Sequence, residues 1–75
     1  MEEMMKEYVV ILEQGENCWG AYCPDVPGCI ATGETREEAE REYRAALAFH
    51  LEGLALEGLP IPEPVSEVRL VQVEM

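Results

Sequence analysis

The sequence has few basic residues. Its 75 positions hold five Lys or Arg against sixteen Asp or Glu, which gives a formal net charge of −11. Proteins that bind nucleic acids rely on Lys and Arg to displace counterions from phosphates, and anionic lipid surfaces attract basic segments for the same reason. The charge therefore argues against direct binding to nucleic acid or to a membrane surface. Two interpretations stay open: the charge provides solubility alone, or it attracts a basic protein partner.

Cysteine is also scarce, and the three cysteines present form no even set. Cys18, Cys23 and Cys29 fit neither paired disulfides nor the C-x-x-C spacing of zinc sites. On one regular strand, Cys18 and Cys23 would point to opposite faces and could not share a metal ion. We interpret the three as small buried hydrophobic residues, with a reactive thiol or a metal ligand as the alternatives. Unpaired thiols favour a reducing cytoplasm.

No long apolar run is present. Residues 1–6 are acidic and lack the basic and apolar regions of a signal peptide, and we expect them to be disordered. No segment approaches the roughly 20 apolar residues that a membrane-spanning helix needs. We therefore expect one cytoplasmic domain, residues 1–75, without membrane association. A chain this short buries only ~60% of its unfolded surface, so a single copy is expected to be marginally stable.

Catalytic signatures are absent as well. Ser66, the only serine, stands in no Gly-x-Ser-x-Gly motif, and no glycine-rich phosphate loop occurs. His50 has no evident catalytic partner, so we interpret it as a core or rim residue. We predict no catalytic residue, cofactor or metal, and expect Asp25 to cap its own turn through a side-chain to backbone hydrogen bond. A metal-dependent nuclease that uses Asp25 and neighbouring carboxylates is the remote alternative.

The chain does contain a strand pattern interrupted by one long helix. The predicted strands, rich in β-branched and aromatic residues, cover residues 7–13, 18–23, 29–32 and 65–73. Thr35 to Glu38 fits a capping box, in which Thr35 accepts from the backbone three residues on and Glu38 reaches back. The helix is expected from about Arg36 to Glu57, because Gly58 and Pro60 stop it. The order β-β-β-α-β predicts an α+β fold with one helix on one sheet face.

The first strand and the helix are both apolar on two sides. In the strand, Tyr8, Val10 and Leu12 have one parity, and Val9 and Ile11 have the other. One helix cannot cover both faces, so another protein surface is expected on the second. The predicted sheet-facing residues of the helix are Ala39, Tyr43, Ala46, Leu47, His50 and Leu54. A second stripe consists of Ala45, Phe49 and Leu56.

The second stripe has two interpretations. It either wraps a small core, or it is an exposed interface for another copy or another partner. A homo-oligomer, a dimer or higher, is expected, because a small domain has little stability in reserve.

Three blocks of the sequence resemble the HicB-like antitoxin family. Residues 21–29 read Ala-Tyr-Cys-Pro-Asp-Val-Pro-Gly-Cys, residues 33–39 read Gly-Glu-Thr-Arg-Glu-Glu-Ala, and residues 61–64 read Ile-Pro-Glu-Pro. They occur in the order and spacing of the family, and the resemblance covers nearly the whole chain. Its structural motif residues here are Pro24, Asp25, Pro27, Gly28, Thr35 and Glu38.

The resemblance implies both a fold and a role. The fold is a partly degraded ribonuclease-H-like sheet of strand order 3-2-1-4, without a catalytic carboxylate constellation. The role is to bind and silence a small basic ribonuclease toxin with a double-stranded-RNA-binding-like fold, which suits the charge of −11. Many members carry a C-terminal DNA-binding domain, and no basic helix or arm occurs before Met75, so direct repression of an operon is not expected. A solo regulatory or scaffold domain with a different protein partner is the alternative.

Overall fold

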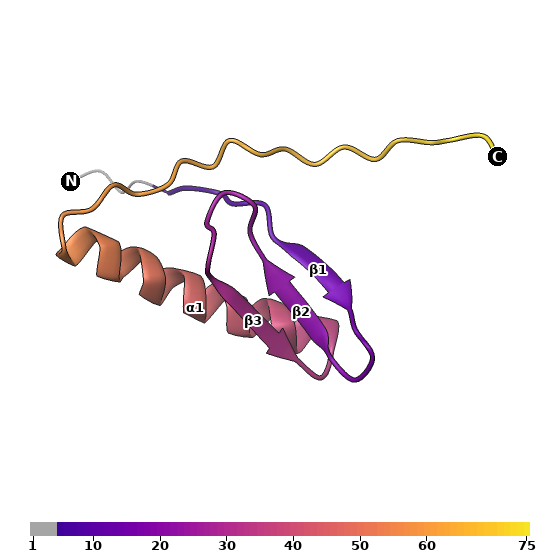
Figure 1. Ribbon diagram of the computed structural model, residues 1–75, viewed down its shortest axis with the longest axis horizontal. Coiled ribbons are helices and arrows are strands. Elements are labelled where there is room, and N and C mark those ends of the chain that lie inside the picture. The colour runs from indigo at the N-terminus through magenta and orange to yellow at the C-terminus, as the bar shows by residue number, and fades with distance from the viewer. Residues whose placement is uncertain (1–4) are drawn as a thin grey trace.

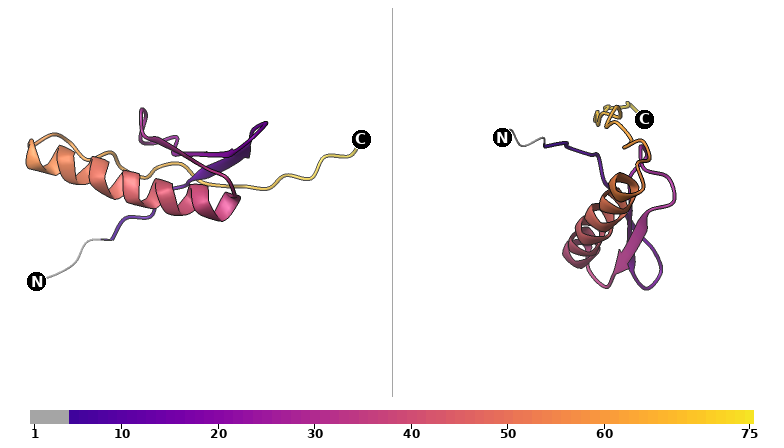
Figure 2. Two further views of the ribbon diagram at one scale, coloured as in Figure 1. Left: turned by 90° about the horizontal axis from the view of Figure 1, so that it is seen from below. Right: turned by 90° about the vertical axis from the view of Figure 1, so that its left-hand side faces the viewer.

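Three short strands and one helix make up the ordered body of the protein. The computed structural model describes residues 5–75, and the predicted disorder of residues 1–6 falls largely on residues 1–4, outside that range. The elements are β1 (Ile11–Gln14), β2 (Trp19–Tyr22), β3 (Ile30–Gly33) and α1 (Arg36–Leu56). As Figures 1 and 2 show, α1 lies across one face of the sheet. The predicted α+β class and the β-β-β-α order are confirmed.

The sheet is antiparallel, with β2 in the middle. β1 pairs with β2 and β2 with β3, so that Leu12 stands opposite Ala21 and Ala21 opposite Ala31. The first strand was predicted to start at residue 7, but in the structure it starts at Ile11. Continuing its register would place Pro24 opposite Val9, and proline has no N–H to donate to a ladder. The sheet therefore ends where the loop after β2 begins.

The predicted fourth strand is the main difference between expectation and structure. Residues 60–75 contain no regular secondary structure, so a strand over residues 65–73 is wrong for the single chain, and the order 3-2-1-4 is not confirmed. The segment is extended and runs past the body of the molecule in Figure 1. A strand needs a neighbour to complete its backbone hydrogen bonds. No strand of the described chain lies in register beside this segment.

Both ends of α1 follow the predicted signals. The hydroxyl oxygen Oγ1 of Thr35 accepts a hydrogen bond from the Glu38 N–H at 3.1 Å, and the Glu38 carboxylate accepts from the Glu34 N–H at 2.6 Å. The reciprocal bond of the capping box thus reaches one residue further back than predicted. At the other end, Gly58 has φ of 71° and the Leu59 N–H donates to the Leu54 carbonyl at 2.9 Å. This Schellman-type closure stops the helix.

The core lies between the sheet and the first half of α1. Its buried residues are Ala21, Cys23, Val26, Cys29, Ala39 and Tyr43. Ala46 and Leu47 pack against them from the helix, as predicted, and Tyr8, Val10 and Leu12 from the first strand and its approach. Cys23 and Cys29 are buried, but Cys18 is exposed in the β1–β2 turn, so its predicted burial is wrong. Cys18 is exposed because it comes before β2, whose residues pack against the helix.

Gly33 sets how closely the helix can approach the sheet. It is the last residue of β3, and a Cβ at this position would lie 2.5 Å from the Ala39 backbone nitrogen. That separation is shorter than any van der Waals contact allows. The Arg36 guanidinium, at the start of α1, lies over the ring of Trp19 in β2, 5.6 Å from its centroid. The close approach at Gly33 and this cation–π contact together hold the first turn of α1 on the sheet.

Candidate partner-binding surfaces

The helix stripe formed by Ala45, Phe49 and Leu56 is exposed. Phe49 is 78% and Leu56 81% accessible to solvent, so neither side chain belongs to the core. The chain from residue 45 to residue 58 contains no Lys or Arg, and its charged residues are Glu52 and Glu57. The second half of α1 therefore presents large apolar side chains in an entirely acidic setting.

A row of apolar residues crosses the sheet face opposite α1. The register aligns Ile11 with Tyr22 and Tyr22 with Ile30, which makes one row across all three strands. Because Leu12, Ala21 and Ala31 point toward the helix, this row points away from it. Ile30 is 70% exposed. The expectation that one helix leaves the second sheet face uncovered therefore holds for the single chain.

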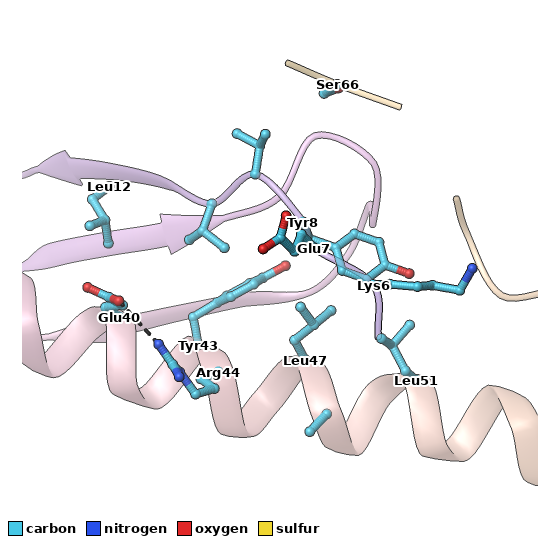
Figure 3. Close-up of a pocket in the computed structure, with 13 residues that line it drawn as sticks. Lys6, Glu7, Tyr8, Leu12, Glu40, Tyr43, Arg44, Leu47, Leu51 and Ser66 are labelled. Carbon is cyan, nitrogen blue, oxygen red and sulfur yellow. Dashed lines mark hydrogen bonds and ion pairs between the residues drawn. The ribbon is translucent and has the colours of Figure 1, made fainter. Parts of the chain in front are cut away.

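A groove runs beside residues 6–10, which lead into β1, and reaches Leu12 of β1 itself. Figure 3 shows its lining, with Tyr8 and Leu12 on one side and Tyr43, Leu47 and Leu51 from α1 on the other. No residue of β2 or β3 lines it, so it lies on the outer side of β1. The charged residues of the lining balance: Lys6 and Arg44 against Glu7 and Glu40. We call this feature the β1 groove.

Asp25 connects the β2–β3 loop to the segment that follows the helix. Its Oδ2 accepts hydrogen bonds from the backbone N–H groups of Val65 at 3.1 Å and Ser66 at 2.9 Å, and its Oδ1 accepts from the Ser66 hydroxyl at 2.9 Å. The bond from the Ser66 N–H is the main cause that holds the pKa of Asp25 below its ordinary value. The prediction that Asp25 caps its own turn is wrong, because its carboxylate accepts hydrogen bonds from a segment 40 residues further along the chain. We call these three bonds the Asp25 clamp.

Two further contacts fasten the same segment to the approach to β1. The Tyr8 hydroxyl donates to the Pro62 carbonyl at 2.6 Å, and the Lys6 ammonium lies 3.2 Å from the Glu63 carboxylate. Burial is the largest cause that raises the pKa of Tyr8. Residues 62–66 are thereby held against the body, although they form no strand. Sequence reasoning missed this partnership, since nothing local in Ser66 or Asp25 reveals that the two meet.

The remaining motif residues shape the loop and the helix start. Gly28 has φ of 88°, a conformation that favours glycine and closes the turn begun by Pro24 and Pro27. Thr35 and Glu38 are the capping residues described above. His50 is half-buried beside Cys29 and Phe49, in agreement with a rim position. Within residues 5–75, no three His, Cys, Asp or Glu side chains are grouped to hold a metal ion.

Tyr43 is the one buried polar side chain that the described residues leave without a hydrogen-bond partner. Its pKa is raised, first by burial and then by the nearby thiols of Cys29 and Cys23. The sequence identified Tyr43 only as a sheet-facing residue. A buried hydroxyl without a partner costs stability, so this position is a weak point of the core.

Comparison with known proteins identifies the family. Residues 8–74 match the family described as HicB_like antitoxin of bacterial toxin-antitoxin system. The chain belongs to the HicB-like antitoxin family. The match begins at Tyr8, in the stretch that approaches β1, and includes the Asp25 clamp and most of the extended segment. The resemblance seen in the three sequence blocks is thus confirmed.

Two curated proteins are similar to this HicB-like chain. One is an uncharacterized 14.9 kDa protein from the rep-hol intergenic region of Haemophilus phage HP1, 34% identical over 62 residues that make up 80% of this chain and 47% of the phage protein. The other is UPF0150 protein ssr1765 of Synechocystis sp., 35% identical over 57 residues, 75% of this chain and 72% of that protein. The chain thus spans about half the length of the phage relative. No solved structure matches it.

Proposed function

We propose that this chain is the antitoxin module of a toxin–antitoxin pair and neutralises a small basic ribonuclease by direct binding. Membership of the HicB-like antitoxin family supports an antitoxin module. The observation that carries the step to a basic partner is the net charge of −11. Opposite fields accelerate the encounter of two proteins and orient it, while an acidic surface repels the RNA that such a toxin binds. The module acts by binding and performs no catalysis of its own.

The helix stripe is the surface that we assign to this partner. Phe49 and Leu56 supply exposed apolar anchors, and Glu52 and Glu57 surround them with negative charge. Interfaces of this type place large apolar side chains at the centre and charges at the rim, where the carboxylates keep some contact with water. A basic toxin would meet its opposite charges there without any unpaired buried carboxylate.

The test is inhibition of the toxin encoded beside this gene. The wild-type chain should suppress RNA cleavage by a small basic protein from an adjacent reading frame, and Phe49→Glu should weaken that suppression at least tenfold, as expected for an anchor residue. Tyr22→Glu, a change of the same kind at an exposed residue on the sheet face opposite α1, should suppress cleavage as well as the wild type. Suppression that withstands Phe49→Glu would exclude the helix stripe as the binding surface. An absence of binding to any such protein would overturn the proposed function.

A solo regulatory or scaffold domain is the second candidate, favoured by the open sheet face. The row of Ile11, Tyr22 and Ile30 is apolar and carries no charge, so it suits an apolar partner better than a basic one. Under this alternative, Tyr22→Glu would abolish partner binding and Phe49→Glu would not. The two variants therefore separate the two functions.

The finer features of the fold and setting belong to the same proposal. The complete sheet has the strand order 3-2-1-4 of a partly degraded ribonuclease-H-like fold, with the fourth strand contributed by residues 65–73. The protein works in the cytoplasm as a homo-oligomer, without direct contact to nucleic acid or membrane. Three free thiols, two of them buried, support a reducing compartment. Within the described residues, no helix is long and apolar enough to cross a membrane.

A further inference from the structure

Residues 67–75, which we call the C-terminal segment, are extended and exposed. Leu70 is 93% accessible to solvent, and Val68, Val71 and Val73 are also largely exposed. Within residues 5–75, no hydrogen bond joins this segment to the rest of the chain. β-Branched and apolar residues at this density are typical of a strand and not of a solvated tail. The segment therefore lacks the neighbour that its composition requires.

The body lacks a strand at a matching position. β1 pairs on one side only, so its outer edge presents unpaired backbone donors and acceptors. The β1 groove reaches that edge at Leu12, and its lining includes Val10 from the approach to β1 and Leu47 and Leu51 from α1. A strand added there would complete the ladder and would cover these apolar side chains at the same time. Each copy thus carries one unpaired strand and one vacant strand position.

The Asp25 clamp decides which copy supplies the strand. Ser66 lies at the mouth of the β1 groove of its own chain, and the clamp fixes its backbone and its hydroxyl there. The residues beyond it continue outward past the body, as Figures 1 and 2 show, instead of turning into the groove. Nine extended residues reach about 30 Å, which exceeds the length of a typical strand. The segment is therefore long enough to reach the edge of another molecule.

Charge favours a second copy of this chain as that molecule. The C-terminal segment contains Glu67, Arg69 and Glu74, a net charge of −1, so the other 66 residues carry −10 of the total −11. The charges that line the β1 groove sum to zero. Two such acidic chains repel each other over most of their surfaces but not at this pair of surfaces. A strongly basic partner would find no charge complementarity in the groove.

We propose that the C-terminal segment of each copy adds as a fourth strand to the β1 edge of a second copy, in a reciprocal exchange that closes a two-fold dimer. The exchange pairs the β1 edge of both copies and fills both β1 grooves, so no β1 edge is left open for a third chain. It uses the proposed strand order 3-2-1-4 but supplies the fourth strand from the partner. It does not depend on the toxin, because the helix stripe stays free.

Sedimentation over a wide dilution series of the full chain tests the exchange. The wild type should dimerise, and Val71→Pro should weaken the dimer about tenfold or more, because proline removes a ladder donor. Val71 is exposed in the single chain, so the dissociated variant should keep the wild-type fold and melting temperature. Phe49→Glu is the control and should leave the dimer unchanged. A monomeric wild type, or a dimer that withstands Val71→Pro, would overturn the proposal.

Nuclear magnetic resonance on mixed samples distinguishes exchange from folding back within one chain. In a mixture of isotope-labelled and unlabelled copies, contacts between the methyl groups of Leu70 or Val71 and those of Leu47 should appear between the two kinds of copy. If the same contacts arise only within a single copy, the strand is added in cis and the exchange is wrong. Toxin inhibition is measured separately with Phe49→Glu, so a failure of either proposal leaves the other intact.

Discussion

The body (β1–β3 and α1) and the extended segment (residues 60–75) are both rich in apolar residues, but only the body forms regular secondary structure. β1–β3 and α1 are joined by backbone ladders and a shared core, whereas residues 60–75 form no ladder. Among the described residues, the hydrogen bonds and the ion pair that reach residues 60–75 come from the side chains of Asp25, Tyr8 and Lys6. Both regions are rich in Val, Leu and Ile. The difference is that each strand of the body meets a partner nearby in the sequence. Apolar composition therefore predicts that a segment will be covered, but not by which chain.

Gly33→Ala should produce the largest loss of stability, because it attacks the closest contact within the body. The new Cβ would lie 2.5 Å from the Ala39 nitrogen, so the first turn of α1 must move away from β3. Overpacking against a backbone atom should cost about 3 kcal/mol of unfolding free energy, measured by urea denaturation. Gly53→Ala is the control: its Cβ meets nothing within 4 Å, and it should stabilise the helix by about 0.5–1 kcal/mol. Equal midpoints for the two variants would contradict the close approach at Gly33.

Thr35→Ala should cost about 1 kcal/mol, the usual loss when a helix cap is removed. The Glu38 N–H would lose the oxygen that accepts its hydrogen bond at 3.1 Å. Thr35→Ser keeps that hydroxyl and should retain most of the stability. The comparison of the three denaturant midpoints checks the cap, and a Ser variant as weak as the Ala variant would show that the methyl group and not the hydroxyl matters.

Tyr43→Phe should be neutral or should stabilise the body by up to about 1 kcal/mol, because it removes a buried hydroxyl without a partner. It should also change the alkaline limit of stability. The pKa of Tyr43 is raised in the folded protein, so the unfolded chain loses this proton first and stability falls as the pH rises above about 10. Thermal melts between neutral and alkaline pH should show a smaller loss for the Phe variant. A destabilised variant at neutral pH would mean that the hydroxyl has a partner.

Asp25→Ala should have the smallest effect on global unfolding and the clearest effect on the extended segment. It removes all three bonds of the Asp25 clamp, so the amide protons of Val65 and Ser66 should exchange faster while those of α1 do not change. Acid should act in the same direction. Since the pKa of Asp25 is lowered, the clamp persists above the ordinary value of 3.8 and is lost as the pH falls through the lowered value. Unchanged exchange at Ser66 would contradict the clamp.

The sequence predicted those parts of the fold that depend on neighbours in the chain. The start of α1 at Arg36, its cap at Thr35 and its stop at Gly58 follow from signals within a few residues, and the hairpins follow from the turns between β-rich stretches. The placement of Asp25 on Ser66 could not be predicted, because the two lie 41 residues apart and neither has a local pattern that names the other. The predicted fourth strand differs from the structure for the same reason. The composition of residues 65–73 indicates a strand, but local sequence does not determine which strand it pairs with.

The three cysteines differ in solvent exposure, so their reactivity can report how often the core opens. Cys18 stands exposed in the β1–β2 turn, while Cys23 and Cys29 lie in the core at 3% and 7% exposure. An alkylating reagent should modify Cys18 in the native protein at the rate of a free thiol, and the other two only when the core opens. Mass spectrometry can count one modified thiol against three in the same sample. The rate at which molecules pass from one modified thiol to three therefore measures how often the sheet and helix separate, without any engineered cysteine.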